Sequence, residues 1–282
     1  KFQKLFMLNV AITGGSGFIG SYLIRYLLKK KINLIQLSKN KNKNKRVRFL
    51  KFDLKKCDSF NYNKLKDIDI LIHLAWIKCF NYHSQYHIEQ LKFHKKFLNK
   101  IILSGIKNIV VSGSCFEYGK KEGVLNEKSS QRPSTSYGLA KLKLLKYLKK
   151  KQNIKKFKLV WLRIFYIEGY FKKSNSIYNL LIKKIKNGVK FFKMSSGNQI
   201  RDYVKIEEIV KIIYKLSILQ KNLGIVNLGS GKKKKLISHV NSWIKIKKSN
   251  IKVIRNFYKI PEYESYKSWA CIKKLNRSLE ID

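Results

Sequence analysis

Residues 13–20 read TGGSGFIG, and this stretch decides the fold of the chain. The apolar run 5–13 comes directly before it and predicts a buried strand. Residues 18–28 follow with apolar side chains at helical spacing, and the three lysines after them favour the end of a helix. A glycine turn that joins a strand to a helix is typical of a site for nucleotide phosphates. The same glycines without this context could form an ordinary turn.

The glycines have separate tasks in such a turn. Gly14 allows the tight bend, Gly17 lets the backbone approach a pyrophosphate, and Gly20 lets the helix pack close to the turn. The free N–H groups and the positive dipole end of the helix then face the phosphates. The turn therefore predicts a dinucleotide site.

Strands and helices alternate through the first part of the chain. Strands are expected at 32–37, 46–52, 68–75, 106–112 and 159–165, and helices at 88–103 and 137–150. This alternation predicts βαβ units and an α/β fold, with a doubly wound parallel sheet of the Rossmann type over residues 1–165.

The remaining residues, 166–282, are less regular. Helices are expected at 177–187, 207–218 and 237–246, and a strand at 224–228. No linker rich in proline and glycine separates the two parts of the chain. We therefore expect a smaller α/β substrate domain that is interleaved with the first domain.

The charge of the chain is unusual. Its 63 basic and 16 acidic residues give a formal net charge of +47, which suggests a nucleic acid or an acidic membrane as partner. The lysines are spread along the whole chain, however, and arginine is scarce, whereas nucleic-acid surfaces tend to favour arginine and clusters. Codon bias in an AT-rich genome explains the composition better, with local basic loops at 39–46 and 232–235.

The sequence contains few signals that indicate the cellular compartment of the protein. No run of about eighteen apolar residues predicts a membrane span. The first ten residues lack a small-residue cleavage site and are read as a strand, not as a signal peptide. The four cysteines, Cys57, Cys79, Cys115 and Cys271, form no CxxC pair, so neither a disulfide framework nor a zinc site is indicated. We expect a protein of the reducing cytoplasm.

Two polar motifs suggest chemistry. Tyr137 and Lys141 are four residues apart, so they share one face of the expected helix, and a nearby ammonium favours the phenolate and proton exchange near neutral pH. Ser114 follows the fifth strand, at the carboxyl edge where open parallel sheets bind ligands. A surface Tyr–Lys pair and a turn serine are the ordinary explanations of these motifs when each is taken alone.

Two histidines have the spacing of metal ligands. His83 and His87 are four residues apart and could bind a metal on one helix face. No third ligand is evident, so a solvated segment over the active site is the favoured interpretation, and no metal is expected.

The glycine turn and the two polar motifs together resemble the extended short-chain dehydrogenase/reductase family, in its NAD-dependent epimerase/dehydratase branch. The resemblance covers nearly the whole chain. Further similar segments are HLA at 73–75, WLR at 161–163, RDYV at 201–204 and NLGSG at 227–231.

The resemblance implies roles for individual residues. Ser114, Tyr137 and Lys141 would form the catalytic triad. The implied cofactor contacts are Gly14, Gly17, Phe18, Ile19, Gly20, Ser38, Lys39, Asp53, Leu54, Leu74, Ala75, Tyr137 and Lys141. Ser114, Tyr166 and Arg201 would bind the substrate, with the arginine on its diphosphate.

Some positions depart from the family pattern. Gln90 and Tyr166 stand where many members carry asparagine, which leaves the placement of the substrate open. Dehydratases of the family have an adjacent Asp–Glu pair directly after the catalytic serine or threonine, whereas this chain has Cys115 and Phe116. Phenylalanine cannot transfer a proton, so a 4,6-dehydratase activity is not expected.

Segments 112–119, 161–166 and 192–204 are most similar to 4-ketoreductases of dTDP- or CDP-linked 6-deoxyhexoses. This implies an oxidoreductase that acts at C4 of such a sugar in surface-polysaccharide biosynthesis. A 4-epimerase that retains NAD is the alternative, and a non-catalytic, nucleic-acid-binding protein is a remote one. Ser38 stands at the end of the second strand and Lys39 follows it, with no carboxylate there, which favours NADP(H) over NAD(H). No membrane partner is expected, and a homodimer stays open.

Overall fold

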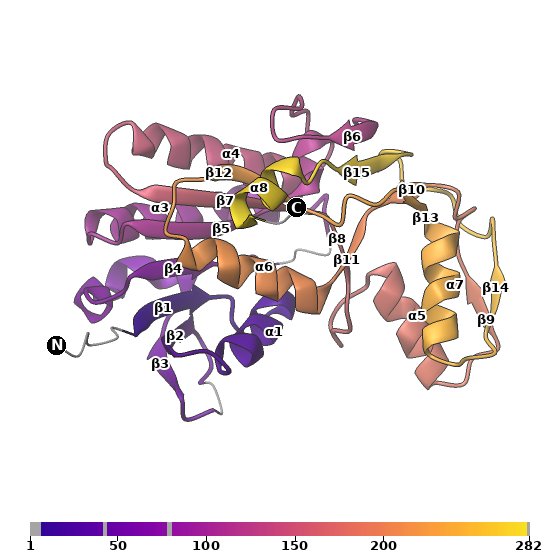
Figure 1. Ribbon diagram of the computed structural model, residues 1–282, viewed down its shortest axis with the longest axis horizontal. Helices are drawn as coiled ribbons and strands as arrows, with labels where there is room; N and C mark the ends of the chain where they lie inside the picture. The colour runs from indigo at the N-terminus through magenta and orange to yellow at the C-terminus, as the bar shows by residue number, and fades with distance from the viewer. Residues whose placement is uncertain (1–6, 42–43, 78–80, 281–282) are drawn as a thin grey trace.

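The computed structural model describes residues 7–41, 44–77 and 81–280. Seven parallel strands form the central sheet, in the order β12-β7-β5-β4-β1-β2-β3 (Figure 1). The strands are β1 (Leu8–Thr13), β2 (Ile32–Ser38), β3 (Val47–Lys51), β4 (Ile70–His73), β5 (Asn108–Ser114), β7 (Lys158–Ile164) and β12 (Gly224–Leu228). The chain order reverses between β1 and β4, so the sheet is doubly wound. The predicted α/β Rossmann fold is confirmed.

Helices cover both faces of this sheet. Helices α1 (Phe18–Leu27) and α6 (Ile206–Ile218) pack on one face, and α3 (Leu91–Leu103) and α4 (Ser136–Gln152) pack on the other. Each pair of helices closes its own buried apolar core against the strands. The carboxyl ends of the parallel strands all lie at one edge of the sheet, where ligands bind in open α/β sheets.

Strand β1 shows how the sequence produces this arrangement. Val10 and Ile12 belong to the core under α1 and α6, whereas Ala11 belongs to the opposite core. Because both faces of the strand are covered, it reads as a continuous apolar run without polar alternation. Two residues of the predicted strand, Leu5 and Phe6, lie outside the described residues, as does Cys79.

Two predicted elements need correction. The strand expected at 106–112 spans Asn108–Ser114, so Ser114 is its last residue. The helix expected at 88–103 is divided at Gln90 into α2 (Tyr86–Glu89) and α3. The Gln90 amide is bonded to the backbone of Ile77, donating from Nε2 to its carbonyl at 3.1 Å and accepting its N–H at 3.2 Å. This tie joins the break between the two helices to the segment after β4.

Residues after 165 contribute to both parts of the molecule. Strand β12, helix α6 and helix α8 (Lys273–Leu279) pack with the large sheet. Helices α5 (Ile177–Lys186) and α7 (Leu236–Ile246) form a smaller lobe at one end (Figure 1), with its own core around Trp243. The two parts are interleaved in the chain, while a domain boundary at residue 165 stays a prediction.

The described residues also contain short strands outside the central sheet, and the sequence did not predict them. They are β6 (Gly123–Leu125), β8 (Tyr166–Glu168), β9 (Phe191–Lys193), β10 (Ile200–Arg201), β11 (Tyr203–Lys205), β13 (Lys234–Lys235), β14 (Lys252–Ile254) and β15 (Ser268–Ala270). Strands this short cannot display the alternation of side chains that identifies a strand in sequence. Within the described ranges, none of the helices is long and apolar enough to cross a membrane.

Candidate active site

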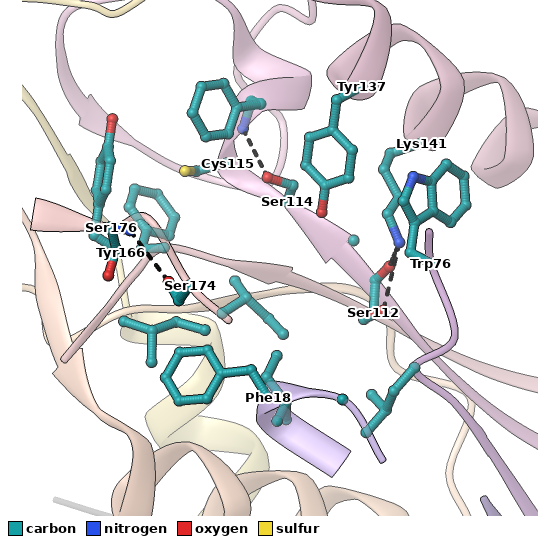
Figure 2. Close-up of a pocket in the computed structure, with 18 of the residues that line it drawn as sticks. Phe18, Trp76, Ser112, Ser114, Cys115, Tyr137, Lys141, Tyr166, Ser174 and Ser176 are labelled. Atoms are coloured by element: carbon teal, nitrogen blue, oxygen red, sulfur yellow. Dashed lines mark hydrogen bonds between the residues drawn. The ribbon is translucent and has the colours of Figure 1, made fainter. Parts of the chain in front are cut away.

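A cavity lies at the carboxyl ends of the central strands (Figure 2). It brings together residues that are far apart in the sequence. Of the predicted site residues, those in its lining are Gly14, Gly17, Phe18, Ile19, Gly20, Leu74, Ser114, Tyr137, Lys141 and Tyr166. Predicted residues beyond its lining are Ser38, Lys39, Asp53, Leu54, Ala75 and Arg201.

The glycine turn is shaped so that side chains cannot fill it. Gly14 has a φ of +73°, and a Cβ there would lie 2.5 Å from the Ala75 backbone nitrogen. A Cβ on Gly20 would lie 2.1 Å from the Gly14 carbonyl oxygen. The turn is closed by a hydrogen bond from the Gly17 N–H to that carbonyl at 2.9 Å, and α1 begins directly after it. This bare backbone at a helix N-terminus fits the pyrophosphate of a dinucleotide.

Helix α4 carries Tyr137 and Lys141 into the cavity. Thr135 caps the helix by accepting the Gly138 N–H at 3.1 Å, and a Cβ on Gly138 would lie 2.4 Å from the Phe116 carbonyl oxygen. The first turn of α4 therefore packs closely against the segment that follows β5. Figure 2 shows the Tyr137 ring between Ser114 and Lys141, with its hydroxyl directed into the cavity.

Lys141 is a buried cation, with 1% of its surface exposed. Its Nζ donates to the Ser112 carbonyl oxygen at 2.7 Å and lies 3.4 Å from the Ser112 hydroxyl. The same ammonium lies 5.7 Å from the centre of the Tyr137 ring. A positive charge at this distance favours the phenolate over the neutral phenol, which is what a proton-transferring tyrosine needs.

Ser114 is held by a short 3₁₀ helix, Cys115–Tyr118. Its hydroxyl accepts the Phe116 N–H at 3.2 Å, and its own N–H donates to the Glu117 carboxylate at 2.9 Å. Cys115 and Phe116 line the cavity, and burial raises the pKa of the Cys115 thiol to about 12. A thiol with so high a pKa stays protonated and is a poor base.

Glu117 is turned away from the cavity and fully buried. One carboxylate oxygen accepts the Trp161 indole N–H at 2.9 Å, and the other accepts Arg163 Nε at 2.7 Å. Because Arg163 is fully buried as well, the pair forms an internal salt bridge between the segment after β5 and strand β7. Glu117 therefore supports the Ser114 backbone, and it is committed to partners that leave it no access to a substrate proton.

Arg201 lies behind the cavity wall. Its guanidinium pairs with Glu264 at 2.5 Å, and its central carbon is 5.3 Å from the centre of the Tyr166 ring. The next residue, Asp202, accepts the N–H groups of Ser230 at 2.7 Å and Gly231 at 3.0 Å. The RDYV segment thus places its arginine against Tyr166 of the cavity lining and uses its aspartate to hold the late glycine turn.

Ser38, Lys39 and Asp53 lie at the carboxyl ends of β2 and β3. Lys39 Nζ is 2.9 Å from the Asp53 carboxylate, and Ser38 donates its hydroxyl to the Asn40 carbonyl at 2.7 Å. Burial tends to raise the pKa of Asp53, but hydrogen bonds from Lys39 and Lys55 and their charges lower it overall. The cation expected to meet a 2′-phosphate is paired with a carboxylate in this structure.

A directional chain of hydrogen bonds runs behind the glycine turn. The Gln90 amide is oriented by Ile77, so its Oε1 accepts from His94 Nε2 at 3.4 Å. His94 Nδ1 then accepts from His73 Nε2 at 2.8 Å, and His73 Nδ1 accepts the Thr13 hydroxyl at 2.7 Å. Each ring has one donor and one acceptor nitrogen, so both histidines are neutral. Burial, together with the charge of Lys141, lowers the pKa of His73 to about 3.

The neutral histidines predict a loss of stability in acid. In the unfolded chain His73 and His94 take up protons below their ordinary pKa of 6.5, whereas the folded protein keeps them neutral. The free energy of unfolding should therefore fall as the pH drops from 6.5 toward 3, by up to about 1.4 kcal/mol per pH unit for each histidine. Urea unfolding at a series of pH values measures this slope.

The control for this prediction is the exposed His83. His83→Gln should keep the slope, and His94→Gln should reduce it. A wild-type free energy of unfolding that is flat across this acid window would contradict the neutral assignment.

The His83 and His87 pair has other contacts. His87 is buried, accepts the Trp76 indole N–H on Nδ1 at 3.0 Å, and donates from Nε2 to the Asn81 carbonyl at 2.7 Å. The His83 ring packs 4.9 Å from the ring of Tyr263. Both nitrogens of His87 are thus used by protein partners.

Sequence reasoning missed several residues of the site. Trp76 and Tyr82 line the cavity, and Glu264 pairs with the predicted Arg201. Trp76 directly follows the HLA segment at 73–75, one of the segments that resemble the family, so its position in the sequence was a visible signal. Glu264 had no such signal, since its partner is 63 residues away.

Comparison with known proteins identifies the family. Residues 10–229 match the NAD dependent epimerase/dehydratase family. The chain is 30% identical to dTDP-6-deoxy-L-talose 4-dehydrogenase (NAD(+)) of Aggregatibacter actinomycetemcomitans, over 93% of this chain and 99% of that protein. It is 26% identical to dTDP-4-dehydro-6-deoxyglucose reductase of Escherichia coli, over 82% and 80%.

A similar fold occurs in solved structures. UDP-glucuronic acid 4-epimerase of Bacillus cereus, in complex with UDP-glucuronic acid and NAD, superposes with a TM-score of 0.85 at 21% identity. The match covers 98% of this chain and 94% of that one. The family match spans the glycine turn, Ser114, the Tyr137–Lys141 pair and the RDYV segment. The chain is an enzyme and belongs to the NAD-dependent epimerase/dehydratase family.

Proposed function

We propose that this enzyme is an oxidoreductase that acts at C4 of a dTDP- or CDP-linked 6-deoxyhexose, by 4-keto reduction or its reverse. The single observation that carries the proposal is the meeting of Ser114, Tyr137 and Lys141 with the glycine turn in one cavity. Relatives named as a 6-deoxytalose 4-dehydrogenase and a 4-dehydro-6-deoxyglucose reductase support the choice of sugar. Synthesis of surface-polysaccharide sugars in the cytoplasm is the setting we propose.

The residues divide the reaction among them. In the reductive direction Tyr137 donates its phenolic proton to the C4 oxygen, and the Ser114 hydroxyl polarises that oxygen by a hydrogen bond. Lys141 orients the nicotinamide ribose and stabilises the phenolate that Tyr137 becomes. A bound NAD(P)H supplies the hydride, and the protein contributes position and electrostatics. The aromatic wall of Phe116 and Tyr82, whose ring centres are 4.4 Å apart, limits water in the cavity.

Arg201 is the proposed anchor for the diphosphate, and Glu264 now occupies it. Substrate binding must exchange a carboxylate for a phosphate, which costs a charge-assisted hydrogen bond. Glu264→Gln should therefore lower the substrate KM roughly tenfold, with a smaller change in kcat. The exposed Glu262→Gln is the matched control and should leave KM unchanged. An unchanged KM in Glu264→Gln would remove Arg201 from the substrate site.

The proposed cofactor is NADP(H) in preference to NAD(H). Lys39 is 60% exposed, and an exposed ion pair such as Lys39–Asp53 is weak enough for a 2′-phosphate to replace. Lys39→Ala should lower the ratio of kcat/KM for NADPH to that for NADH by roughly five- to tenfold. Lys41→Ala is the control on the same basic loop and should keep the ratio. A wild-type enzyme whose kcat/KM is lower for NADPH than for NADH would contradict the proposed preference.

Two alternative functions would be recognised by different experimental results. A nucleotide-sugar 4-epimerase, favoured by the epimerases among similar proteins, would purify with NAD and interconvert two sugars without net use of cofactor. A nucleic-acid-binding protein, suggested by the +47 charge, would bind RNA with an affinity that falls steeply with salt. The intact cavity with Tyr137 and Lys141 argues against the second.

A substrate scan tests the proposed function. The purified enzyme is offered dTDP- and CDP-linked 4-keto-6-deoxyhexoses with NADH and with NADPH, and the absorbance of the reduced nicotinamide is followed. Consumption with one of these sugars is expected. Cofactor that stays bound and unchanged while a 4-hydroxy sugar is epimerised would replace the proposal by the epimerase.

A further inference from the structure

The indole of Trp76 lies directly beside the Tyr137–Lys141 pair (Figure 2). The Lys141 ammonium is 3.8 Å from the centre of the Trp76 ring, and the Tyr137 ring meets that indole edge-on at 6.0 Å. A buried ammonium needs partners to stay charged, and Lys141 has the Ser112 carbonyl at 2.7 Å for this purpose. The face of an indole is the best aromatic partner for a cation. The indole is therefore placed to help keep Lys141 protonated.

The ring plane of Trp76 is fixed by a hydrogen bond. An indole N–H can only donate, so His87 Nδ1 must accept it at 3.0 Å. His87 then carries its proton on Nε2, where the Asn81 carbonyl accepts it at 2.7 Å. His87 is neutral in this arrangement and adds no positive charge that would repel Lys141.

A second histidine supports the same indole. The His94 ring stacks on Trp76 with ring centres 4.2 Å apart and planes inclined by 21°. Hydrogen bonds to His73 and Gln90 fix His94 in turn, and His73 is bonded to Thr13. The indole is thus clamped by two neutral rings, and one of them is linked to the start of the glycine turn.

We propose that Trp76 is a positioning residue, which holds the Lys141 ammonium charged and aimed at Tyr137 so that the charge favours ionisation of the phenol. The proposal rests on the role given above to Tyr137. It predicts that the aromatic face at position 76 sets the pH at which Tyr137 ionises. A residue that only filled space there would affect stability without changing that pH.

The test measures ionisation of Tyr137 without any substrate. The enzyme is labelled with tyrosine carrying ¹³C at the ring carbon that bears the hydroxyl, and its NMR signal is followed against pH. Tyr137→Phe identifies the signal by removing it. The variants are Trp76→Leu, which removes the ring, and Trp76→Phe, which keeps a weaker aromatic face and loses the bond to His87. The matched control is Tyr214→Leu, because Tyr214 is a ring beside a remote ammonium, Lys30 Nζ at 5.4 Å.

Trp76→Leu should raise the midpoint of the Tyr137 titration by about one pH unit, a tenfold change in its ionisation constant. Trp76→Phe should give a smaller rise, and Tyr214→Leu none. An unmoved midpoint in folded Trp76→Leu would overturn the proposal. If that variant does not fold, Trp76→Phe decides the question. A higher midpoint of the Tyr137 titration would support the proposal, and an unmoved midpoint would overturn it.

Turnover supplies the second measurement. In the oxidative direction the rate rises with pH as Tyr137 ionises. In Trp76→Leu this rising part of the pH–rate profile should shift to higher pH by the same amount as the NMR midpoint. A lower kcat in Trp76→Leu without any shift of the pH–rate profile would indicate a structural role only. Absence of activity on C4 of nucleotide sugars would refute the proposed function, while the NMR titration would still decide the role of Trp76.

Discussion

Replacement of Tyr137 by phenylalanine should lower kcat by roughly 10²–10⁴-fold, because it removes the one group that gives a proton to the forming alkoxide. The Kd for the cofactor should change little, because the Tyr137 ring, its packing on Phe116 and Tyr82, and Lys141 all remain. Stopped-flow turnover and a cofactor titration measure the two quantities separately.

The comparison variant for this prediction is Lys141→Ala. Lys141 is proposed both to hold the nicotinamide ribose and to favour the Tyr137 phenolate, so its loss should weaken cofactor binding and turnover together. A Tyr137→Phe enzyme with turnover near that of the wild type would refute the assignment of the proton donor.

The second large effect is expected on stability. Glu117→Ala should lower the free energy of unfolding by about 3–5 kcal/mol, because it leaves the buried Arg163 cation without its counter-charge. The same change removes the acceptor for the Trp161 indole N–H and for the Ser114 N–H. Chemical denaturation of wild type and variant gives the difference directly.

The matched control for Glu117 is an exposed pair. Asp58→Ala removes the partner of Lys96 at the surface and should change stability little. If Glu117→Ala costs no more than Asp58→Ala, the buried salt bridge does not support the Ser114 segment as described. If instead Glu117→Gln keeps full stability and abolishes turnover, Glu117 is a proton-transferring group and the structural assignment is wrong.

The parts of the fold that the sequence predicted are those with local signals. The strand, glycine turn and helix around residues 8–27 are set by side chains that are neighbours in the chain, and so are Tyr137 and Lys141 on one helix face. Ser114 was placed at the end of a parallel strand, which is a consequence of topology alone. The structure places these groups around one cavity.

The parts that the sequence did not predict depend on contacts between distant segments. Glu117 lies in a 3₁₀ helix that turns it toward Arg163, 46 residues away, and no signal near Glu117 in the chain predicted that partner. Lys39 looked like a free cation for a phosphate, and its pairing with Asp53 depends on β2 and β3 being neighbours. Side-chain pairing across a sheet cannot be read from periodicity, because periodicity only assigns faces.

The enzyme's reaction at C4 is tested most directly by isotope transfer. The enzyme is given NADPH or NADH deuterated at the transferable position of the nicotinamide, together with a dTDP-linked 4-keto-6-deoxyhexose, and the sugar product is analysed by NMR and mass spectrometry. We expect a 4-hydroxy product with deuterium at C4 and one equivalent of oxidised cofactor. Epimerised sugar without deuterium or net oxidation would contradict it, as would sustained formation of a 4-keto-6-deoxy product from dTDP-glucose or CDP-glucose with NAD.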